Sequence, residues 1–427
     1  MDSLGYYYWI VGITALYLLF LLIQKRYRLL LPSTIHTFIW LVTAVLIIFE
    51  LKGIGVTQQM SDKQFHLVSK LSCLIVCFSV IGFAIAHVFT APKELVSWVN
   101  FIDKNVIDAI LIKFRWIPYG CGIVGVILFA FLLSVMGDIS SFGDYRRMAL
   151  FTERVGFMSI VQRISGHINI LGFFYLLLLG YKSGQEGIQL KTFFKYVILC
   201  SAINMSIGGR VWIVTSILPF MITYMFARHY SLMPEKIKKR DNRKFLMIFL
   251  LSISMFSIIG LLRGDEKDET NFVDKFLYLT DGSKMTNMVL SQYPENMYEL
   301  EYGRSEFLYP FIGSPMAEKF QESIAHDPGL SVTVKSIMPY LYFDFGVWGG
   351  VVMWGIICFI IEYFCIRFKY GCSIMGLLWF GQLAYLLFQT PVGHIFSVNT
   401  PVFEWLILIF IFRKWIFRNI PNVQQYI

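Results

Sequence analysis

Apolar runs long enough to cross a bilayer recur along the whole chain, and short polar segments separate them. A transmembrane helix needs about 20 predominantly apolar residues. The last run is short, and Gly208 and Gly209 would also allow the two runs around them to form one broken helix. The pattern predicts an all-α polytopic transmembrane helix bundle of about eleven spans, near residues 5–23, 34–51, 71–91, 117–136, 166–181, 192–209, 211–227, 245–262, 346–366, 372–392 and 401–412.

The composition supports a membrane protein. Hydrophobic residues make up 56% of the 427 positions and charged residues only 15%, whereas an ordinary globular protein has about 25% charged residues. This excludes a soluble enzyme, a disordered chain and a secreted disulfide scaffold. The seven cysteines lie within or beside apolar runs, so neither a disulfide framework nor a zinc site is predicted. The first apolar run has no basic leader, and we expect it to be retained as a span.

The net charge of +9 arises from basic residues that flank the apolar runs. They are not gathered on one domain, so a nucleic-acid partner is not predicted. Clusters of Lys and Arg follow the first span, precede the eighth and follow the last. All three fall on one side if the number of spans is odd. By the positive-inside rule, the amino terminus then lies outside and the carboxyl terminus in the cytoplasm.

The spans divide the chain into three parts. Residues 1–262 form an N-terminal bundle of about eight spans, 263–345 a large external loop, and 346–427 about three further spans and a short cytoplasmic tail. Connections of this length without structure or function of their own are uncommon. Near-helical spacing of apolar residues within 272–289 predicts short amphipathic helices on the membrane surface. A similar pattern over 99–110 predicts an interfacial helix on the cytoplasmic side.

The run Gly208-Gly209-Arg210 stands where two apolar runs meet. Two glycines permit the backbone to break, and a charge at this depth usually faces a partner or a wet cavity. Opened helix ends would also direct backbone N–H groups at an anion. The alternative is a tight external hairpin whose Arg210 extends to the lipid headgroups.

Further arginines lie on the predicted outer side, against the general charge bias. Guanidinium groups bind phosphate oxygens bidentately and stay charged, which suits a diphosphate-bearing lipid. Each arginine alone is more typical of a solvated side chain, but the set favours an anionic external ligand. The set comprises Arg146, Arg147 and Arg154 in the loop 137–165, Arg263 at the start of the long loop, and Arg304 after Tyr302 and Gly303.

Several groups could act as a general base. His326 and the carboxylates of the long loop are eligible, and Asp344 precedes the ninth span, where we expect it to cap the helix, with a site role as the alternative. The chain has no Asp-x-Asp, no phosphate-binding Walker loop, no Gly-x-Ser-x-Gly and no His-Glu-x-x-His. Neither a divalent metal nor a cofactor is therefore predicted, and ATP-driven transport and hydrolase chemistry lose support.

The ordered set of features resembles the Wzy-type O-antigen polymerases, which join the oligosaccharide repeat units of bacterial surface polysaccharides. The resemblance covers most of the chain. It implies a GT-C-like, metal-independent membrane glycosyltransferase of the inner membrane with its active site on the periplasmic side. It rests on the span count, the Arg-rich loop after the fourth span, Gly208-Gly209-Arg210, Arg263, and the runs 276–280, 302–304, 339–346 and 349–350.

The resemblance also implies a mechanism and partners. The growing glycan would leave its undecaprenyl diphosphate and pass en bloc to a new lipid-linked repeat unit, with a flippase and a chain-length regulator as partners. Arg210 and Arg263 would hold the donor diphosphate, and Arg304 would orient glycan or phosphate. The base would be His326, Asp344 or a loop Glu. The substrate-binding residues would be Arg146 or Arg147 on the acceptor diphosphate, with Arg154, Gly208, Gly209 and Tyr302.

Two other functions stay open at this point. An O-antigen ligase of the same superfamily would pass the glycan to a lipid A core instead of a repeat unit. A lipid-linked oligosaccharide flippase or transporter would move its substrate without forming a bond. Transporters of that class typically carry internal pseudo-repeats, and the chain shows no long sequence repeat.

Overall fold

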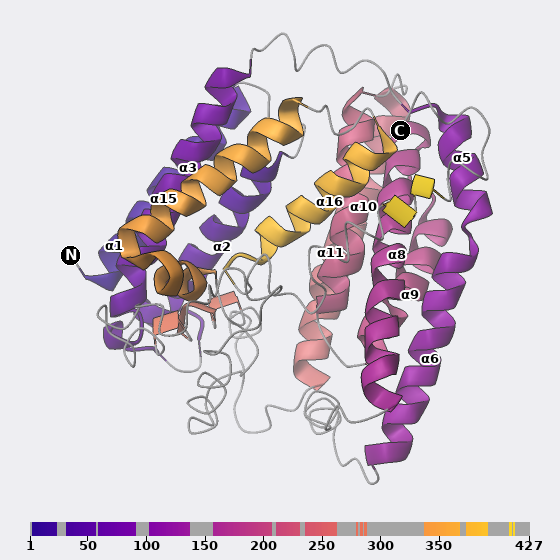
Figure 1. Ribbon diagram of the computed structural model, residues 1–427, viewed down its shortest axis with the longest axis horizontal. Helices are drawn as coiled ribbons and strands as arrows, with labels where there is room; N and C mark the ends of the chain where they lie inside the picture. The colour runs from indigo at the N-terminus through magenta and orange to yellow at the C-terminus, as the bar shows by residue number, and fades with distance from the viewer. Residues whose placement is uncertain are drawn as a thin grey trace. The chain divides into compact units, whose positions relative to one another are not determined.

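The computed structural model describes most of the apolar part of the chain as α-helix, and no strand occurs among the residues that it describes (Figure 1). The chain is therefore an all-α protein in its described part, as predicted. The described residues are 2–23, 31–56, 59–90, 102–136, 157–206, 211–230, 235–262, 279–280, 282–284, 286–287, 337–367, 373–391, 410–411 and 413–414.

The chain folds into two compact units, and each unit is made of segments that are not consecutive in the sequence. The first unit comprises Met1–Ser97, Glu269–Lys369 and Gln382–Val402, and the second comprises Trp98–Asp268, Tyr370–Gly381 and Phe403–Ile427. The first unit thus joins the amino-terminal helices to a helix near residue 350, because these segments bury apolar surface against one another.

The first unit contains the helices α1 (Ser3–Ile23), α2 (Pro32–Lys52), α3 (His66–Phe89) and α15 (Met338–Arg367), with a short 3-10 helix η2 (Asp62–Gln64). Helices α3 and α15 lie side by side (Figure 1). A Cβ atom on Gly82 would lie 2.2 Å from the carbonyl oxygen of Gly355, so only glycine permits this approach of the two backbones.

Helix α2 is the most buried helix of the first unit because it packs against several neighbours. Its start has Pro32 in the first turn, where the missing N–H needs no partner. Its end has Gly53 in the left-handed region, with φ of 68°, and the N–H groups that follow reach the carbonyls of the last turn. In the core, the His36 ring lies 5.5 Å from Phe83 and 5.9 Å from Trp354, centroid to centroid.

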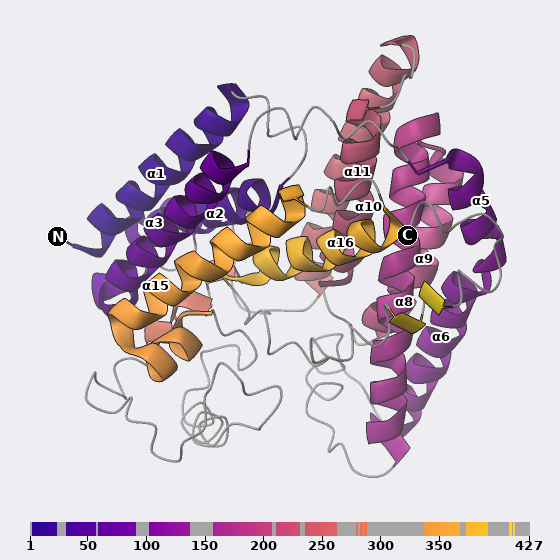
Figure 2. The ribbon, with the colours of Figure 1, turned by 45° about the horizontal axis from the view of Figure 1, so that its top comes forward.

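The second unit contains six described helices, which pack through glycines. A Cβ atom on Gly180 would lie 2.3 Å from the Phe220 carbonyl of α10, and one on Gly125 would lie 2.6 Å from the Ala202 backbone of α9. Figure 2 shows α6 alongside α9. The helices are α5 (Lys104–Lys113), α6 (Trp116–Met136), α8 (Phe157–Glu186), α9 (Leu190–Ser206), α10 (Val211–Tyr230) and α11 (Glu235–Leu262), while α16 (Ile374–Gln389) is shared between the units.

Each of the first ten predicted spans coincides with a helix, and the interfacial helix predicted over 99–110 corresponds to α5. Asp103 caps α5, because its Oδ1 accepts the N–H of Asn105 at 2.8 Å. Of the last predicted span, 401–412, only residues 410 and 411 are described, and both are helical. The positions of the first ten helices and of α5 are thus confirmed, whereas the last span and the interfacial location of α5 stay predictions.

Five segments of the described chain are long and apolar enough to cross a membrane: Ser3–Ile23, Pro32–Lys52, His66–Phe89, Lys104–Ser134 and Phe345–Arg367. The chain is therefore a helical, membrane-embedded protein. The count of about eleven spans and the GT-C-like arrangement stay predictions, as does the division into 1–262, 263–345 and 346–427.

The helix that contains Asp344 differs from the expectation. Helix α15 begins at Met338, eight residues before the predicted span, and its backbone leaves the helical region at Gly346, with φ of 65° and ψ of −175°. Asp344 lies within the helical residues before this break, so the expectation that it caps the ninth span is wrong. A positive φ is cheap only for glycine, which places the break at Gly346.

Candidate functional site

Most of the predicted site residues lie outside the described residues, and their convergence on one site stays a prediction. The helices that flank them are described. Helix α9 ends at Ser206 and α10 begins at Val211, on either side of residues 207–210, and α11 ends at Leu262, directly before Arg263. The site residues outside the described part are Arg146, Arg147, Arg154, Gly208, Gly209, Arg210, Arg263, Tyr302, Arg304 and His326.

The short first part of α15, which contains Asp344, is fixed by contacts at its start and by close packing against the residues after the break. The N–H of Ile337 donates to the carbonyl of Thr390 at 3.1 Å, and the indole Nε1 of Trp40 donates to the Thr390 hydroxyl at 3.1 Å. After the break, a Cβ on Gly350 would lie 2.8 Å from the Leu341 carbonyl, so the short first part of α15 folds back closely on the long second part. The glycine at 350 is therefore required by this close approach.

A described piece of the long loop, which belongs to the first unit, docks onto the end of α2 through a buried ion pair. The Lys284 Nζ lies 2.6 Å from the Glu50 Oε1, and the two side chains are only 10% and 1% exposed. Breaking such a buried pair by removing one partner leaves an uncompensated charge, which is strongly destabilising. We call Glu50, Lys284, Asn287 and Ser283 the loop anchor.

Asn287 of the loop anchor supplies the cap that α3 lacks in its own sequence. The N-cap residue Phe65 offers no side-chain acceptor. The Asn287 Oδ1 instead accepts the N–H groups of Leu67 at 2.9 Å and Val68 at 3.2 Å, and its Nδ2 donates to the Lys63 carbonyl at 3.2 Å. Backbone N–H groups in the first turn of a helix need an external acceptor, so the loop and α3 stabilise each other.

Further polar contacts join the start of α15 and the loop anchor to the starts of α1 and α3. The buried Tyr7 hydroxyl lies beside the hydroxyls of Ser72 and Ser283, and the Ser72 hydroxyl donates to the Met338 sulfur at 3.2 Å. The N–H of Ser3 donates to Oδ1 of Asp62 at 3.2 Å. The starts of α1, α3 and α15 and the end of α2 thus meet at one end of the first unit. The predicted topology places this end outside.

A second buried cluster lies at the opposite end of the first unit, between the start of α2 and the ends of α3 and α15. Glu362 is completely buried. Its Oε2 accepts the N–H of Ser33 at 3.0 Å, its Oε1 accepts the Ser33 hydroxyl at 2.6 Å, and the Nε2 of His87 lies 2.9 Å from Oε1. The N-terminus of α2 favours negative charge at this position.

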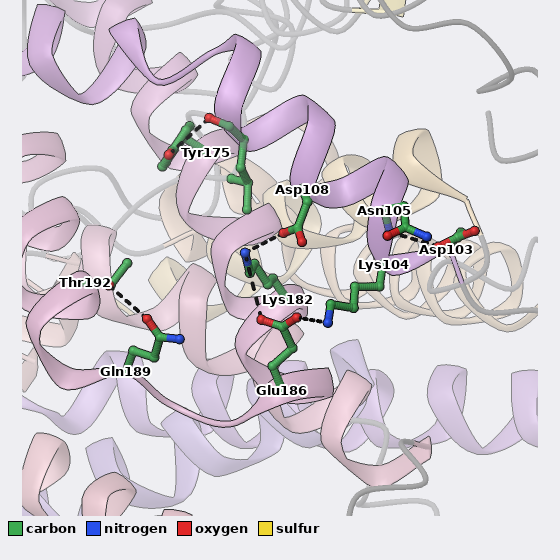
Figure 3. Close-up of polar contacts among 10 residues, drawn as sticks. Asp103, Lys104, Asn105, Asp108, Tyr175, Lys182, Glu186, Gln189 and Thr192 are labelled. Carbon is green, nitrogen blue, oxygen red and sulfur yellow. Dashed lines mark hydrogen bonds and ion pairs between the residues drawn. The ribbon is translucent and has the colours of Figure 1, made fainter.

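Ion pairs organise one end of the second unit, between α5 and the end of α8 (Figure 3). Lys104 pairs with Glu186, and Lys182 pairs with Asp108 and lies 3.8 Å from Glu186. These side chains are partly exposed, so the pairs contribute little stability individually and mainly fix the position of α5 against α8.

The turn between α8 and α9 is held from α11. The completely buried Asp241 accepts the N–H of Ile188 at 2.9 Å, and the Lys244 ammonium donates to the Ile188 carbonyl and lies 3.5 Å from the Asp241 carboxylate. Both backbone groups of Ile188 are thereby satisfied, which gives this network a structural role.

Sequence reasoning missed both buried clusters of the first unit. Glu50 stands at the end of an apolar run and Lys284 within a polar loop, and each pattern alone is typical of a solvated residue. The sequence does offer a signal in Glu362, a carboxylate inside an apolar run, where an ionisable residue suggests a function or a buried partner.

The described helices define the class of the protein, an α-helical membrane protein with several apolar helices of spanning length. Within the described part of the chain, no three His, Cys, Asp or Glu side chains come together in a way that could hold a metal ion. Comparison of the chain with family models, curated proteins and solved structures finds no match.

Proposed function

We propose that the chain is a membrane glycosyltransferase that polymerises a bacterial surface polysaccharide, such as an O-antigen, at the periplasmic face of the inner membrane. The observation that supports this most is the loop anchor. The pair Lys284–Glu50 and the cap from Asn287 dock the described residues 282–284 and 286–287 of the long segment after α11 onto α2 and α3. A long segment that is docked in this way suits a substrate-binding role better than a simple connection does.

The arginines proposed for the reaction adjoin helix ends that the topology places outside. Arg210 directly precedes α10 and Arg263 directly follows α11. Helix ends are rigid compared with the middle of a long loop, so they suit groups that must hold a diphosphate in register. Guanidinium groups at these ends would bind the phosphate oxygens bidentately.

In the proposed reaction, a hydroxyl of the new lipid-linked repeat unit attacks the anomeric carbon at the reducing end of the growing glycan. The carbon–oxygen bond to undecaprenyl diphosphate breaks, and the diphosphate leaves with the bonding electron pair. Arg210 and Arg263 stabilise the negative charge that develops on it. His326, Asp344 or a loop Glu takes the proton of the attacking hydroxyl. Arg304 orients the glycan, and Arg146 or Arg147 holds the acceptor diphosphate.

The test replaces Arg210 and Arg263 separately with Ala and with Lys, in a strain whose long surface glycan depends on this chain. We expect the glycan ladder to collapse to a single repeat unit in each variant, since Lys lacks the planar fork of Arg. Arg243→Ala, at an exposed position of α11, is the matched control and should leave the ladder intact. Full ladders from all four site variants at normal protein level would contradict the proposed roles.

A second assay separates the polymerase from the alternatives. Purified protein is incubated with lipid-linked repeat units alone, and the products are separated by size. The polymerase forms a ladder from this substrate by itself. Product formation only after a core lipid is added would identify a ligase instead, and transbilayer movement without any new bond would identify a flippase.

A further inference from the structure

We propose that the joint surface of α6 and α9 binds the headgroup of an anionic phospholipid at the end where both helices begin. The site consists of the basic–aromatic patch, which we define as Arg115, Trp116, Tyr119, Lys191 and Lys195. All five side chains are exposed, and the two aromatic rings keep 48% and 43% of their surface accessible. This inference does not depend on the proposed enzymatic activity.

The two helices present the patch as one continuous surface. The Lys195 Nζ of α9 lies 5.1 Å from the centroid of the Tyr119 ring of α6. Further along the same two helices, the backbones approach closely, because a Cβ on Gly125 would lie 2.6 Å from the Ala202 backbone. Arg115 directly precedes Trp116 in the turn that leads into α6, and Lys191 lies one helical turn before Lys195 on α9, so all three cations belong to the end where both helices begin.

An apolar strip continues from the patch along both helices. On α6, Ile123, Val126 and Ile127 follow Tyr119 at helical spacing and are 62%, 67% and 58% exposed. On α9, Ile198 follows Lys195 by three residues and is 51% exposed. The order of apolar, then aromatic, then basic side chains is typical of a helix surface that passes from acyl chains to headgroups. The surface can therefore bind both the headgroup and the acyl chains of a phospholipid. Free phosphate has no acyl chains and would not contact the apolar strip.

The cations of the patch differ from the nearby Lys104 and Lys182, because only the latter two are paired with described carboxylates. Among the described residues, Arg115, Lys191 and Lys195 have no carboxylate within ion-pair distance. At the same end of the same unit, Lys104 and Lys182 are neutralised by carboxylates (Figure 3). Three cations without a described carboxylate partner, one of them beside an aromatic ring, complement an anionic headgroup, whereas a zwitterionic headgroup brings its own cation.

The test compares two double variants of the full-length protein with equal loss of charge. Lys191→Gln with Lys195→Gln removes two cations of the patch, and Lys104→Gln with Lys182→Gln removes two paired lysines as the control. Native mass spectrometry in detergent counts the molecules of phosphatidylglycerol or phosphatidylcholine that stay bound during a titration. Thermal unfolding of each variant establishes that the protein is folded.

We expect the patch variant to bind phosphatidylglycerol roughly 25-fold more weakly, about fivefold for each lysine near a membrane surface. Its binding of phosphatidylcholine should change less than about twofold, as should phosphatidylglycerol binding by the control. Lys195→Arg keeps the cation beside the ring and should bind as the wild type does. If the double variant does not fold, Lys195→Gln alone should weaken phosphatidylglycerol binding about fivefold.

Three results would overturn the proposal. Unchanged phosphatidylglycerol binding in both the double and the single patch variant would show that the patch is not the site. An equal loss in the control variant, or an equal loss of both lipids, would show that the effect is not local electrostatics. Displacement of phosphatidylglycerol by the same concentration of inorganic phosphate would show that the site recognises a phosphate group without the lipid.

Discussion

The loop anchor gives the sharpest stability test, because its central ion pair is buried and joins two segments far apart in the sequence. Replacing Lys284 with Met removes the ammonium group that lies 2.6 Å from Glu50, whose side chain is only 1% exposed, and so takes this cation away from a buried carboxylate. The expected result is a loss of unfolding free energy together with release of the segment around Lys284 from the helix ends.

The magnitude follows from the geometry. At 2.6 Å and an effective dielectric constant of about 20, the Coulomb attraction between Lys284 and Glu50 is about 6 kcal/mol. Desolvation of the two groups offsets much of this attraction, and removal of one partner of a buried pair typically costs about 3–5 kcal/mol. Because Lys284 keeps 10% exposure, we expect the lower end of that range, about 3 kcal/mol. The double variant Lys284→Met with Glu50→Gln removes the stranded charge and should recover most of the loss.

The assay is unfolding in mixed micelles of mild detergent and sodium dodecyl sulfate, followed by helical circular dichroism. The two single variants and the double variant give a coupling free energy, which we expect to be about 2 kcal/mol. Lys70→Met, at an exposed position of α3, is the matched control and should change the unfolding free energy by less than about 0.5 kcal/mol. A coupling near zero, or a Lys284→Met variant as stable as the control, would refute the reasoning.

Two further predictions concern the packing and the buried carboxylate of the first unit. Gly82→Ala should lower the unfolding free energy by about 1–3 kcal/mol, because the new methyl group meets the backbone of α15, whereas Gly12→Ala, with open space around it, should not be destabilising in the same micelle assay. Glu362→Leu leaves the N–H and hydroxyl of Ser33 without their acceptor and should cost about 3 kcal/mol, while Glu362→Gln keeps an acceptor oxygen and should cost less. Equal stability of the two members of either pair would contradict the respective prediction.

The two buried clusters of the first unit have different consequences for the proposed function. The loop anchor joins the long segment to the ends of the helices that the topology places outside, where the polymerase reaction would occur. A weakened loop anchor should therefore shorten the glycan ladder. The Glu362 cluster lies at the other end of the unit, so its loss should lower stability and protein level without a specific effect on glycan length.

The helices could be predicted from local sequence because an apolar run of spanning length forms a helix by itself. The predicted starts and ends for α1, α2 and α6 differ from the observed ones by only a few residues, and Asp103 was within the pattern that predicted α5. In a membrane, every backbone polar group must be satisfied within its segment, so a long apolar run has helix as its one available structure.

The charged positions of the candidate sites could not be predicted in the same way. Ser33 and Glu362 are 329 residues apart in the sequence, and their hydrogen bonds exist only because α2 and α15 pack in the same unit. For Asp344, local preference predicted a helix cap, because Asp is common at helix N-termini. The residue instead lies inside α15, two residues before the break at Gly346. Local preference is a weak guide wherever a close backbone approach decides the conformation.

The amino-acid sequence by itself determined that this protein is helical, embedded in a membrane and basic on one predicted side, since these properties depend on the length and polarity of individual runs. Only the tertiary structure decided which carboxylates are buried, which lysines are neutralised and where the long segment docks. The physical reason is that the energy of a charge depends on the groups within a few ångströms of it, and packing brings those groups from distant parts of the chain.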